Sequence, residues 1–218
     1  MALVAGASGA VGQALVQILL DHAAYRRVKV LVRKPLALRH PKLETLLLPA
    51  EGPAALAETL AADDVFCCLG TTQKRAGSQA AFERVDYHLV LDVARSALAA
   101  GATQFVVVSS LGAALRSPSF YSRVKGRMEQ AVLELPYRTV HVLRPSLLLT
   151  GARAEARPAE WLAQQLMPLL NPLLRGRLAR MRAIAAEDVA AAMVTLALRD
   201  AHGGQVHHLP LGVDDPTA

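Results

Sequence analysis

Tyr121 and Lys125 are the two side chains whose types and spacing most directly indicate chemistry in this chain. Ser117-Pro118-Ser119, just before them, is typical of the start of a helix, and residues four apart on a helix share one face. An ammonium beside a phenol favours the phenolate and lowers its pKa, which is about 10 in an unperturbed tyrosine. The pair therefore predicts a tyrosine that exchanges protons with a substrate. Exposed helices also carry such pairs by chance, so this interpretation depends on the surrounding elements.

Near the start of the chain, three glycines at intervals of three residues follow a short apolar run, Leu3 to Ala5. This pattern predicts a strand, a tight turn and a helix start. Gly6 is expected to make the turn, Gly9 to leave space for phosphates, and Gly12 to let the helix pack on the strand. Because the first N–H groups of a helix are unpaired, the predicted ligand is a dinucleotide pyrophosphate. The residues predicted to contact it are Gly6, Ala7, Ser8, Gly9, Ala10, Val11 and Gly12. An ordinary strand-to-helix turn remains the alternative.

The choice of cofactor is indicated by the end of the next expected strand, Val28–Val32, which completes a βαβ unit after a helix over about residues 10–23. NAD-binding proteins usually carry a carboxylate at this point, which accepts hydrogen bonds from the ribose 2′-OH. Here Arg33 and Lys34 stand there instead. Two cations would bind a 2′-phosphate, so the sequence favours NADP over NAD. The alternative is that both are exposed loop cations.

Two later strands are expected to end in small polar residues, where open α/β sheets bind their ligands. The strand Asp64–Leu69 runs into Gly70-Thr71-Thr72, and the strand Gln104–Val108 runs into Ser109-Ser110. The residues expected to touch the cofactor at the first of these ends are Leu69, Gly70 and Thr71.

The remaining patterns complete a single domain over residues 1–218, a doubly wound α/β fold with a mostly parallel sheet and helices on both faces. Expected elements are strands at Glu44–Leu48, Arg138–Arg144 and Gln205–Leu209, a short helix at 54–61 and a final helix at Glu187–Leu198. A further helix should bury a stripe formed by Phe82, Val85, Leu89, Val93 and Ala97, and Gly101 should end it. Residues 74–78 are polar and mobile in composition. Residues 158–174 suggest broken helices that form a small lid, a substrate wall or a dimer contact, within a substrate or lid region over about residues 145–182.

Composition limits the other function classes. The chain has 218 residues, of which 53% are hydrophobic and 4% aromatic, which suits buried helices and parallel strands. The adjacent Cys67 and Cys68 are expected to be reduced thiols, which fits a cytoplasmic protein, and neither a targeting nor a membrane-spanning segment is expected. The net charge of +6 favours anionic partners, and a basic cluster is formed by Arg175, Arg177, Arg180 and Arg182. The scarcity of aromatic residues makes a nucleic acid an unlikely partner. No metal site is expected, because His207 and His208 are adjacent on a strand and point to opposite faces.

Together, the glycine turn, the Ser-Ser strand end and Tyr121-x-x-x-Lys125 resemble the short-chain dehydrogenase/reductase superfamily. Within it, the chain is similar to the atypical branch that includes the Tat-interacting protein oxidoreductases, over nearly its whole length. The residues that carry this likeness are Cys67-Cys68-Leu69-Gly70-Thr71-Thr72, Arg144-Pro145 and Arg157-Pro158-Ala159-Glu160-Trp161-Leu162.

The resemblance implies roles for individual residues. Ser110 would polarise a substrate carbonyl, with Ser109 as the competing serine; Tyr121 would exchange the proton; and Lys125 would hold the nicotinamide ribose and tune Tyr121. The loop after Arg144, with Pro145 and Leu148, would cover the nicotinamide half, and Arg157 would reach the site. Many members carry an Asn for proton relay where this chain has Asp86, and that departure puts the relay in question.

The predicted function is an NADP-dependent oxidoreductase that moves a hydride between nicotinamide and a small carbonyl or alcohol substrate. Two alternatives stay open. One is a redox-sensing regulatory protein that binds NADP(H) with little turnover, and the other is a nucleic-acid-associated protein. A homodimer is compatible with either enzyme or sensor.

Overall fold

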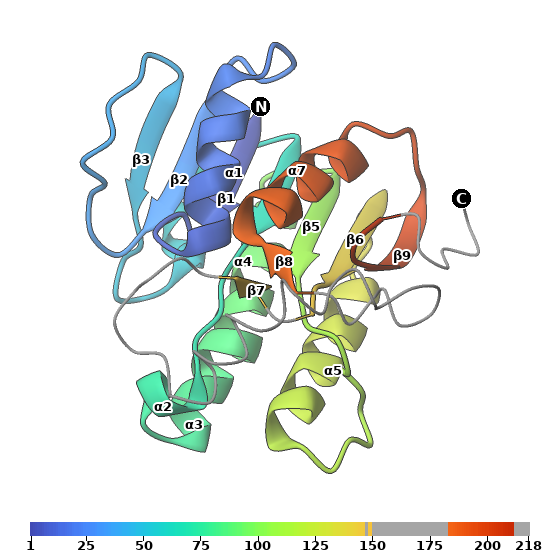
Figure 1. Ribbon diagram of the computed structural model, residues 1–218. Helices are drawn as coiled ribbons and strands as arrows, with labels where there is room; N and C mark the ends of the chain where they lie inside the picture. Colours follow the sequence, from blue (N-terminus) through green and yellow to red (C-terminus); the bar gives the residue numbers. More distant parts are fainter. Residues whose placement is uncertain (147, 150–182, 212–218) are drawn as a thin grey trace.

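A seven-stranded parallel sheet forms the centre of the molecule in the computed structural model, which describes residues 1–146, 148–149 and 183–211. The strand order is β3-β2-β1-β4-β5-β6-β9 (Figure 1). The strands are β1 (Ala2–Ala5), β2 (Val28–Val32), β3 (Leu43–Leu47), β4 (Asp64–Cys67), β5 (Gln104–Val108), β6 (Thr139–Arg144) and β9 (Gly203–His208). All six neighbouring pairs run parallel, which confirms the expected doubly wound fold.

Helices cover both faces of this sheet because its strands are apolar on both sides. One hydrophobic core joins the sheet to helices α1 (Ala10–Asp21) and α7 (Ala186–Ala197), and these two helices also contact each other. A second core joins the other face to α4 (Leu89–Ala99), α5 (Phe120–Leu133) and the 3₁₀ helix η1 (Pro53–Leu60). The short elements are α2 (Gln73–Ala76), α3 (Gln79–Glu83), the π-helical η2 (Arg84–His88), and the paired strands β7 (Leu148–Leu149) and β8 (Ile184–Ala185).

The strand order reverses between β1 and β4, since the chain builds outward from β1 to β3 and then outward from β4 to β9. In open α/β sheets, a crevice for ligands lies at the carboxyl ends of the strands that flank this reversal. The turn after β1 and the segment after β4 both lie there. The glycine turn and Gly70-Thr71 are therefore brought to one edge of the sheet.

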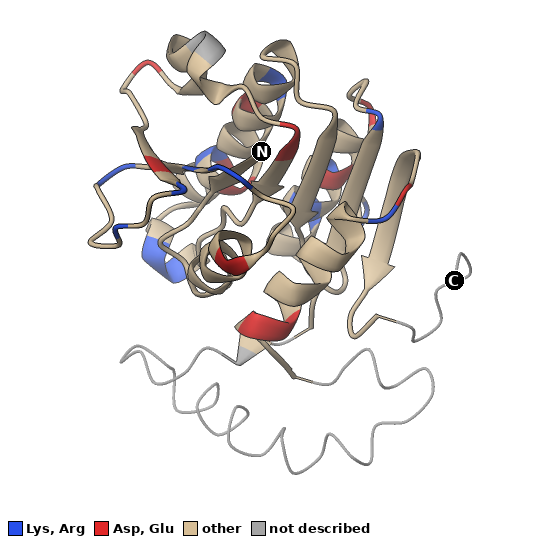
Figure 2. Cartoon of the chain, turned by 90° about the horizontal axis from the view of Figure 1, so that it is seen from above, with Lys and Arg blue, Asp and Glu red and all other residues tan. Residues whose placement is uncertain are grey.

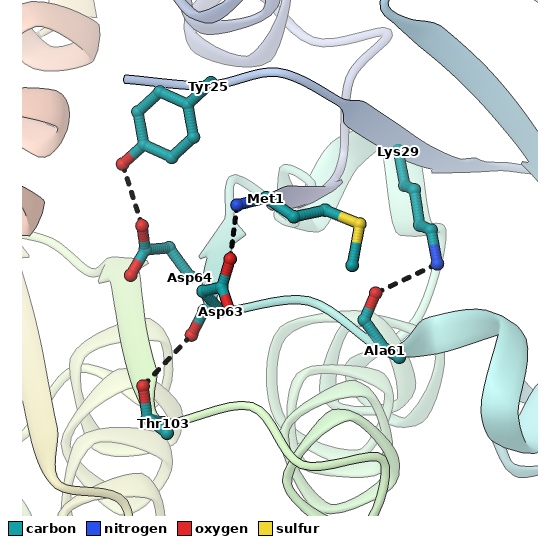
Figure 3. A network of polar contacts seen from close by, with 7 residues as sticks. All are labelled: Met1, Tyr25, Lys29, Ala61, Asp63, Asp64 and Thr103. Atoms are coloured by element: carbon teal, nitrogen blue, oxygen red, sulfur yellow. Dashed lines mark hydrogen bonds and ion pairs between the residues drawn. The ribbon is translucent and has the colours of Figure 1, made fainter.

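The opposite, amino-terminal edge is held together by polar contacts within the protein (Figure 3). The Tyr25 hydroxyl donates to Asp64 at 2.9 Å, and the amino group of Met1 forms an ion pair with Asp63. The buried Lys29 ammonium donates to the carbonyl oxygens of Thr59 and Ala61, at 2.7 and 2.9 Å. The buried Lys29 and the part-buried Tyr25–Asp64 pair are satisfied by the chain itself, so this edge is structural.

The bounds of the predicted elements are confirmed to within two residues, and the differences concern one strand end, one helix type and one segment expected to be mobile. The predicted strand Asp64–Leu69 ends at Cys67, and the short helix at 54–61 is a 3₁₀ helix. Residues 74–78, expected to be mobile, include part of α2, which the Thr72 side chain caps by accepting a hydrogen bond from the Arg75 amide. The proposed lid over 145–182 and the cluster Arg175–Arg182 fall mostly or wholly outside the described residues.

The buried stripe predicted for the helix that carries Phe82 to Ala97 is wrong in part. Val85 and Leu89 are only half-buried, whereas Asp86 and Val90 are buried. The π-helical η2 explains this shift, because each of its backbone hydrogen bonds spans one residue more than in an α-helix. The buried face therefore runs through Asp86 and Val90 and rejoins the predicted stripe at Val93 and Ala97.

Buried thiols and histidines fill the remaining core. Cys67 and Cys68 are free, as expected, and burial raises the pKa of the Cys67 thiol to about 11.

None of the helices formed by residues 1–146 and 183–211 has the length and apolar composition needed to cross a bilayer. The same ranges contain no cluster of three or more metal-binding side chains, and His207 instead contacts His141 on β6, with Nδ1 of His141 3.0 Å from Nε2 of His207.

The two histidines predict a pH-dependent stability. Burial, the His207 ring and Arg199 lower the pKa of His141 to about 4, whereas an unfolded histidine titrates near 6.5. The pair therefore contributes stability above pH 6.5 that is lost as the pH falls toward 4. The free energy of unfolding should be about 2 kcal/mol lower at pH 5 than at pH 8 on this account.

Urea unfolding at the two pH values, with wild type and His141→Gln, measures this effect. The variant should keep much less of the pH dependence than wild type. An unchanged pH dependence in His141→Gln would show that other groups cause it.

Candidate cofactor-binding and catalytic site

The turn from β1 to α1 has two glycines that the protein's own packing requires. Gly6 has a φ of +87°, and a Cβ there would lie 2.6 Å from the backbone of Cys68. A Cβ at Gly12 would lie 2.2 Å from the carbonyl oxygen of Gly6. Both positions allow the close approach of backbone that the sequence predicted. The turn consequently lies directly against the chain that leaves β4.

Gly9 is different, because the folded chain does not itself exclude a side chain there. Its φ of −80° is accessible to any residue, it is exposed, and the nearest atom to an added Cβ is the Gly6 oxygen at 3.4 Å. Gly9 is also the N-cap of the twelve-residue α1, which begins without a side-chain cap. Open space thus faces the unpaired N–H groups at the positive end of a helix dipole. The uncapped helix start fits a phosphate that a Cβ at Gly9 would displace.

A buried ion pair lies beside the segment after β4. Nζ of Lys125 on α5 is 2.9 Å from Oδ1 of Asp86 on η2, and the two residues are 3% and 1% exposed. The other carboxylate oxygen of Asp86 accepts a hydrogen bond from the Thr71 amide at 2.9 Å. A Cβ at Gly70 would lie 3.4 Å from Oδ1 of Asp86 and 3.9 Å from Nζ of Lys125. Gly70 therefore adjoins the ion pair.

Tyr121 and Lys125 lie on α5 as predicted, and the capping residue Ser119 starts this helix by accepting from the Ser122 amide. Burial alone would lower the pKa of Lys125, but Asp86 and Tyr121 raise it above its ordinary value. Lys125 is therefore an ammonium at neutral pH. The Tyr121 ring packs against Phe82, with ring centroids 5.5 Å apart. The structure thus places a cation beside Gly70, and the Tyr121 phenol interacts electrostatically with that cation.

Ser109 and Ser110 follow β5, the next strand in the sheet after β4. The ladder with β6 continues past them, since the Ser109 amide donates to the Leu143 carbonyl at 2.7 Å. Both hydroxyl oxygens are buried, and neither has a hydrogen-bond partner among the described residues. A buried hydroxyl without a partner is costly, so these groups suit a polar ligand atom.

The other predicted cofactor residues have different environments. Arg33 and Lys34 are exposed at the carboxyl end of β2, on a loop where Lys and Arg recur (Figure 2). Leu69 is half-buried, and its amide nitrogen would lie 2.8 Å from a Cβ at Gly6. Pro145 is buried, Leu148 lies in β7, and Arg157 falls outside the described residues.

Two contacts of charged residues were not predicted from the sequence. The guanidinium of Arg144, predicted to contact the cofactor, makes a two-pronged ion pair with Glu129 on α5. Asp86 was noted only as a departure from the family pattern, and its contact with Lys125 was missed. The available signal for Asp86 was its position four residues after Phe82, which places it on the same face of a helix, whereas nothing in the local sequence marks Glu129.

The arrangement of the glycine turn agrees with the comparison to known families. The NAD(P)H-binding family matches residues 6–153, a range that includes the turn, both serines and the ion pair. The chain belongs to this family. Cofactors of the NAD(P) class are therefore confirmed, and the preference for NADP over NAD stays a prediction.

Similar proteins confirm the predicted likeness to the branch that includes the Tat-interacting protein oxidoreductases. Protein HTATIP2 of Rattus norvegicus is 37% identical over 164 residues, which cover 73% of this chain and 67% of that protein. Protein FMP52-1, mitochondrial, of Scheffersomyces stipitis is 32% identical over 151 residues, which cover 68% of this chain and 67% of that protein. Because the fungal protein is named mitochondrial, the cytoplasmic location expected for this chain stays a prediction.

Solved structures with the same fold include oxidoreductases. A short-chain dehydrogenase/reductase family oxidoreductase from Burkholderia thailandensis has a TM-score of 0.69 at 23% identity, covering 94% of this chain and 89% of that chain. MoeE5 in complex with UDP-glucuronic acid and NAD also has a TM-score of 0.69, at 21% identity, covering 94% of this chain and 75% of that chain. At these identities the likeness shows a shared Rossmann-like fold.

Proposed function

We propose that this chain is an NADP-dependent oxidoreductase that moves a hydride between the nicotinamide and a small carbonyl or alcohol substrate. The observation that carries this proposal is the buried Lys125 ammonium, which lies near Tyr121 and beside Gly70 at the ligand-binding edge of the sheet. A chain that only bound a dinucleotide would gain little from a phenol next to a buried cation. Proton transfer coupled to the cofactor's redox chemistry gives both groups a role.

Each residue has a defined part in this proposal. The turn from Gly6 to Gly12 holds the pyrophosphate at the start of α1, and Gly70-Thr71 lies along the cofactor. Lys125 holds the nicotinamide ribose. When bound, the nicotinamide supplies or accepts the hydride. In the reduction direction, Tyr121 gives a proton to the carbonyl oxygen, while Ser110 donates a hydrogen bond to that oxygen. Ser109 is the competing donor, because its buried hydroxyl also lacks a hydrogen-bond partner within the part of the chain that the structure describes.

A second candidate is supported by the ion pair. Asp86 neutralises Lys125, so the ammonium acts on Tyr121 less strongly than an unpaired cation would. This balance favours a protein that binds NADP(H) and regulates a partner with little turnover. Cofactor binding without reduction of any carbonyl in a broad panel distinguishes this sensor from the enzyme.

The choice of cofactor is tested by affinity. NADPH should bind at least about tenfold more tightly than NADH, equivalent to about 1.4 kcal/mol, because Arg33 and Lys34 can contact the 2′-phosphate. Fluorescence titration of both cofactors against wild type measures the ratio. Arg33→Ala should reduce it.

Arg27→Ala is a matched control, because Arg27 is an exposed arginine at the amino end of the same strand. That variant should keep the wild-type preference. Equal affinity of wild type for NADPH and NADH would contradict the NADP assignment.

A further inference from the structure

Asp86 connects two parts of the candidate site. One of its oxygens contacts Lys125 on α5, and the other accepts the Thr71 amide from the segment after β4. The carboxylate lies on the π-helical turn η2, where Asp86 is buried while the neighbouring Val85 is only half-buried. A π turn weakens the regular helix, and such turns are frequent at functional sites. The local helix geometry is thus suited to placing one carboxylate.

Among residues 1–146 and 183–211, the other charged side chains are not observed to form a second ion pair with Lys125. Tyr121 on its own helix and Cys67 on β4 also interact electrostatically with its ammonium, but neither is a carboxylate. Glu129, one turn further along α5, is paired with Arg144, and Glu83 is paired with Arg127. Asp86 is therefore the carboxylate that balances Lys125.

We propose that Asp86 is a positioning residue, which acts through Lys125 by holding its ammonium in place and charged against the Gly70-Thr71 segment. This inference rests on the proposed function for its meaning, because Lys125 is there assigned to the cofactor ribose. Asp86 itself needs no contact with cofactor or substrate. Its carboxylate sets where the lysine lies and compensates a charge that is almost fully buried.

The substitution Asp86→Asn separates charge from shape. An asparagine keeps an oxygen that can accept the Thr71 amide, but it leaves Lys125 buried without a counter-ion. Burial then dominates and lowers the pKa of Lys125 below its unfolded value. Relative to wild type, the loss of folding stability in the variant should be largest at neutral pH, where the lysine is charged. The loss should become smaller as the pH rises toward 10.

Thermal melting without cofactor tests this directly. Asp86→Asn should lower the melting temperature by about 10 °C at pH 7 and by less than about half of that at pH 10. Adding Lys125→Met removes the uncompensated charge, so the double variant should melt at a higher temperature than Asp86→Asn alone at pH 7. Glu83→Gln is the matched control, because it breaks the more exposed pair with Arg127 and should shift melting by no more than about 2 °C at either pH.

The inference would be overturned if the losses in melting temperature from the two substitutions were additive in the double variant. It would also be overturned if the loss in Asp86→Asn were the same at pH 7 and pH 10.

NADPH titration at a temperature where every variant is folded gives a second, independent readout. Asp86→Asn, Lys125→Met and the double variant should weaken binding by similar factors, about tenfold each, because they disable one unit. If Asp86→Asn bound NADPH with the affinity of wild type, the proposed role of Asp86 would also be overturned. Failure of wild type to bind NADPH would instead contradict the proposed function, while the melting data would still decide the role of Asp86.

Discussion

Tyr121→Phe should lower the rate of carbonyl reduction by about two to four orders of magnitude and leave NADPH affinity unchanged. The substitution removes one hydroxyl and keeps the ring that packs against Phe82. General acid catalysis is therefore lost while the local packing is retained. Steady-state reduction of a reactive aldehyde, alongside fluorescence titration of NADPH, separates the rate from the affinity.

Tyr87→Phe is the matched control for this experiment. Tyr87 lies on η2 and contacts Arg127 through its ring face, with 4.7 Å between the guanidinium carbon and the ring centroid, and phenylalanine keeps that face. Its rate should stay within about threefold of wild type. If Tyr121→Phe also stays within that range, Tyr121 is not the proton donor.

Gly9→Val has the second largest expected effect, and it acts on binding. A branched side chain would occupy the space that faces the start of α1, so the Kd for NADPH should rise at least about 100-fold. The backbone conformation at Gly9 permits valine, and the nearest protein atom to its Cβ is 3.4 Å away. The melting temperature should therefore stay within about 3 °C of wild type.

Two further variants sharpen this result. Gln17→Val places the same side chain at an exposed position further along α1 and should bind NADPH like wild type. Gly12→Val should instead destabilise the fold, because its Cβ would collide with the Gly6 carbonyl. Normal NADPH binding by a folded Gly9→Val would place the dinucleotide elsewhere.

The sheet could be predicted from the sequence because its signals are local. Apolar runs such as Val28–Val32 can be buried on both faces, and alternation with helical patterns predicts parallel strands. The turn at Gly6 and the helix start at Ser119 follow from backbone rules within a few residues. The spacing of Tyr121 and Lys125 likewise fixes their common face once the helix is known.

Long-range contacts between charged groups could not be predicted in the same way. The π turn places Asp86 where it meets Lys125 and Thr71, which lie 39 and 15 residues away in the sequence, and helical periodicity alone predicted Val85 at that position. Arg144 was assigned to the cofactor from the family resemblance, yet its guanidinium contacts Glu129, 15 residues earlier. A single sequence shows which charges exist, but the pairing is set by tertiary packing.

In the proposed reaction, a bound nicotinamide transfers a hydride to the carbonyl carbon and Tyr121 gives a proton to the carbonyl oxygen. Stopped-flow mixing of the NADPH-loaded protein with a panel of aldehydes and ketones, followed by NADPH absorbance, tests it most directly. We expect the wild-type protein to oxidise its bound NADPH in a single turnover with at least one substrate, and Tyr121→Phe to do so at least about 100-fold more slowly. Tight NADPH binding by wild type with no oxidation by any member of the panel would contradict the claim and favour the redox sensor.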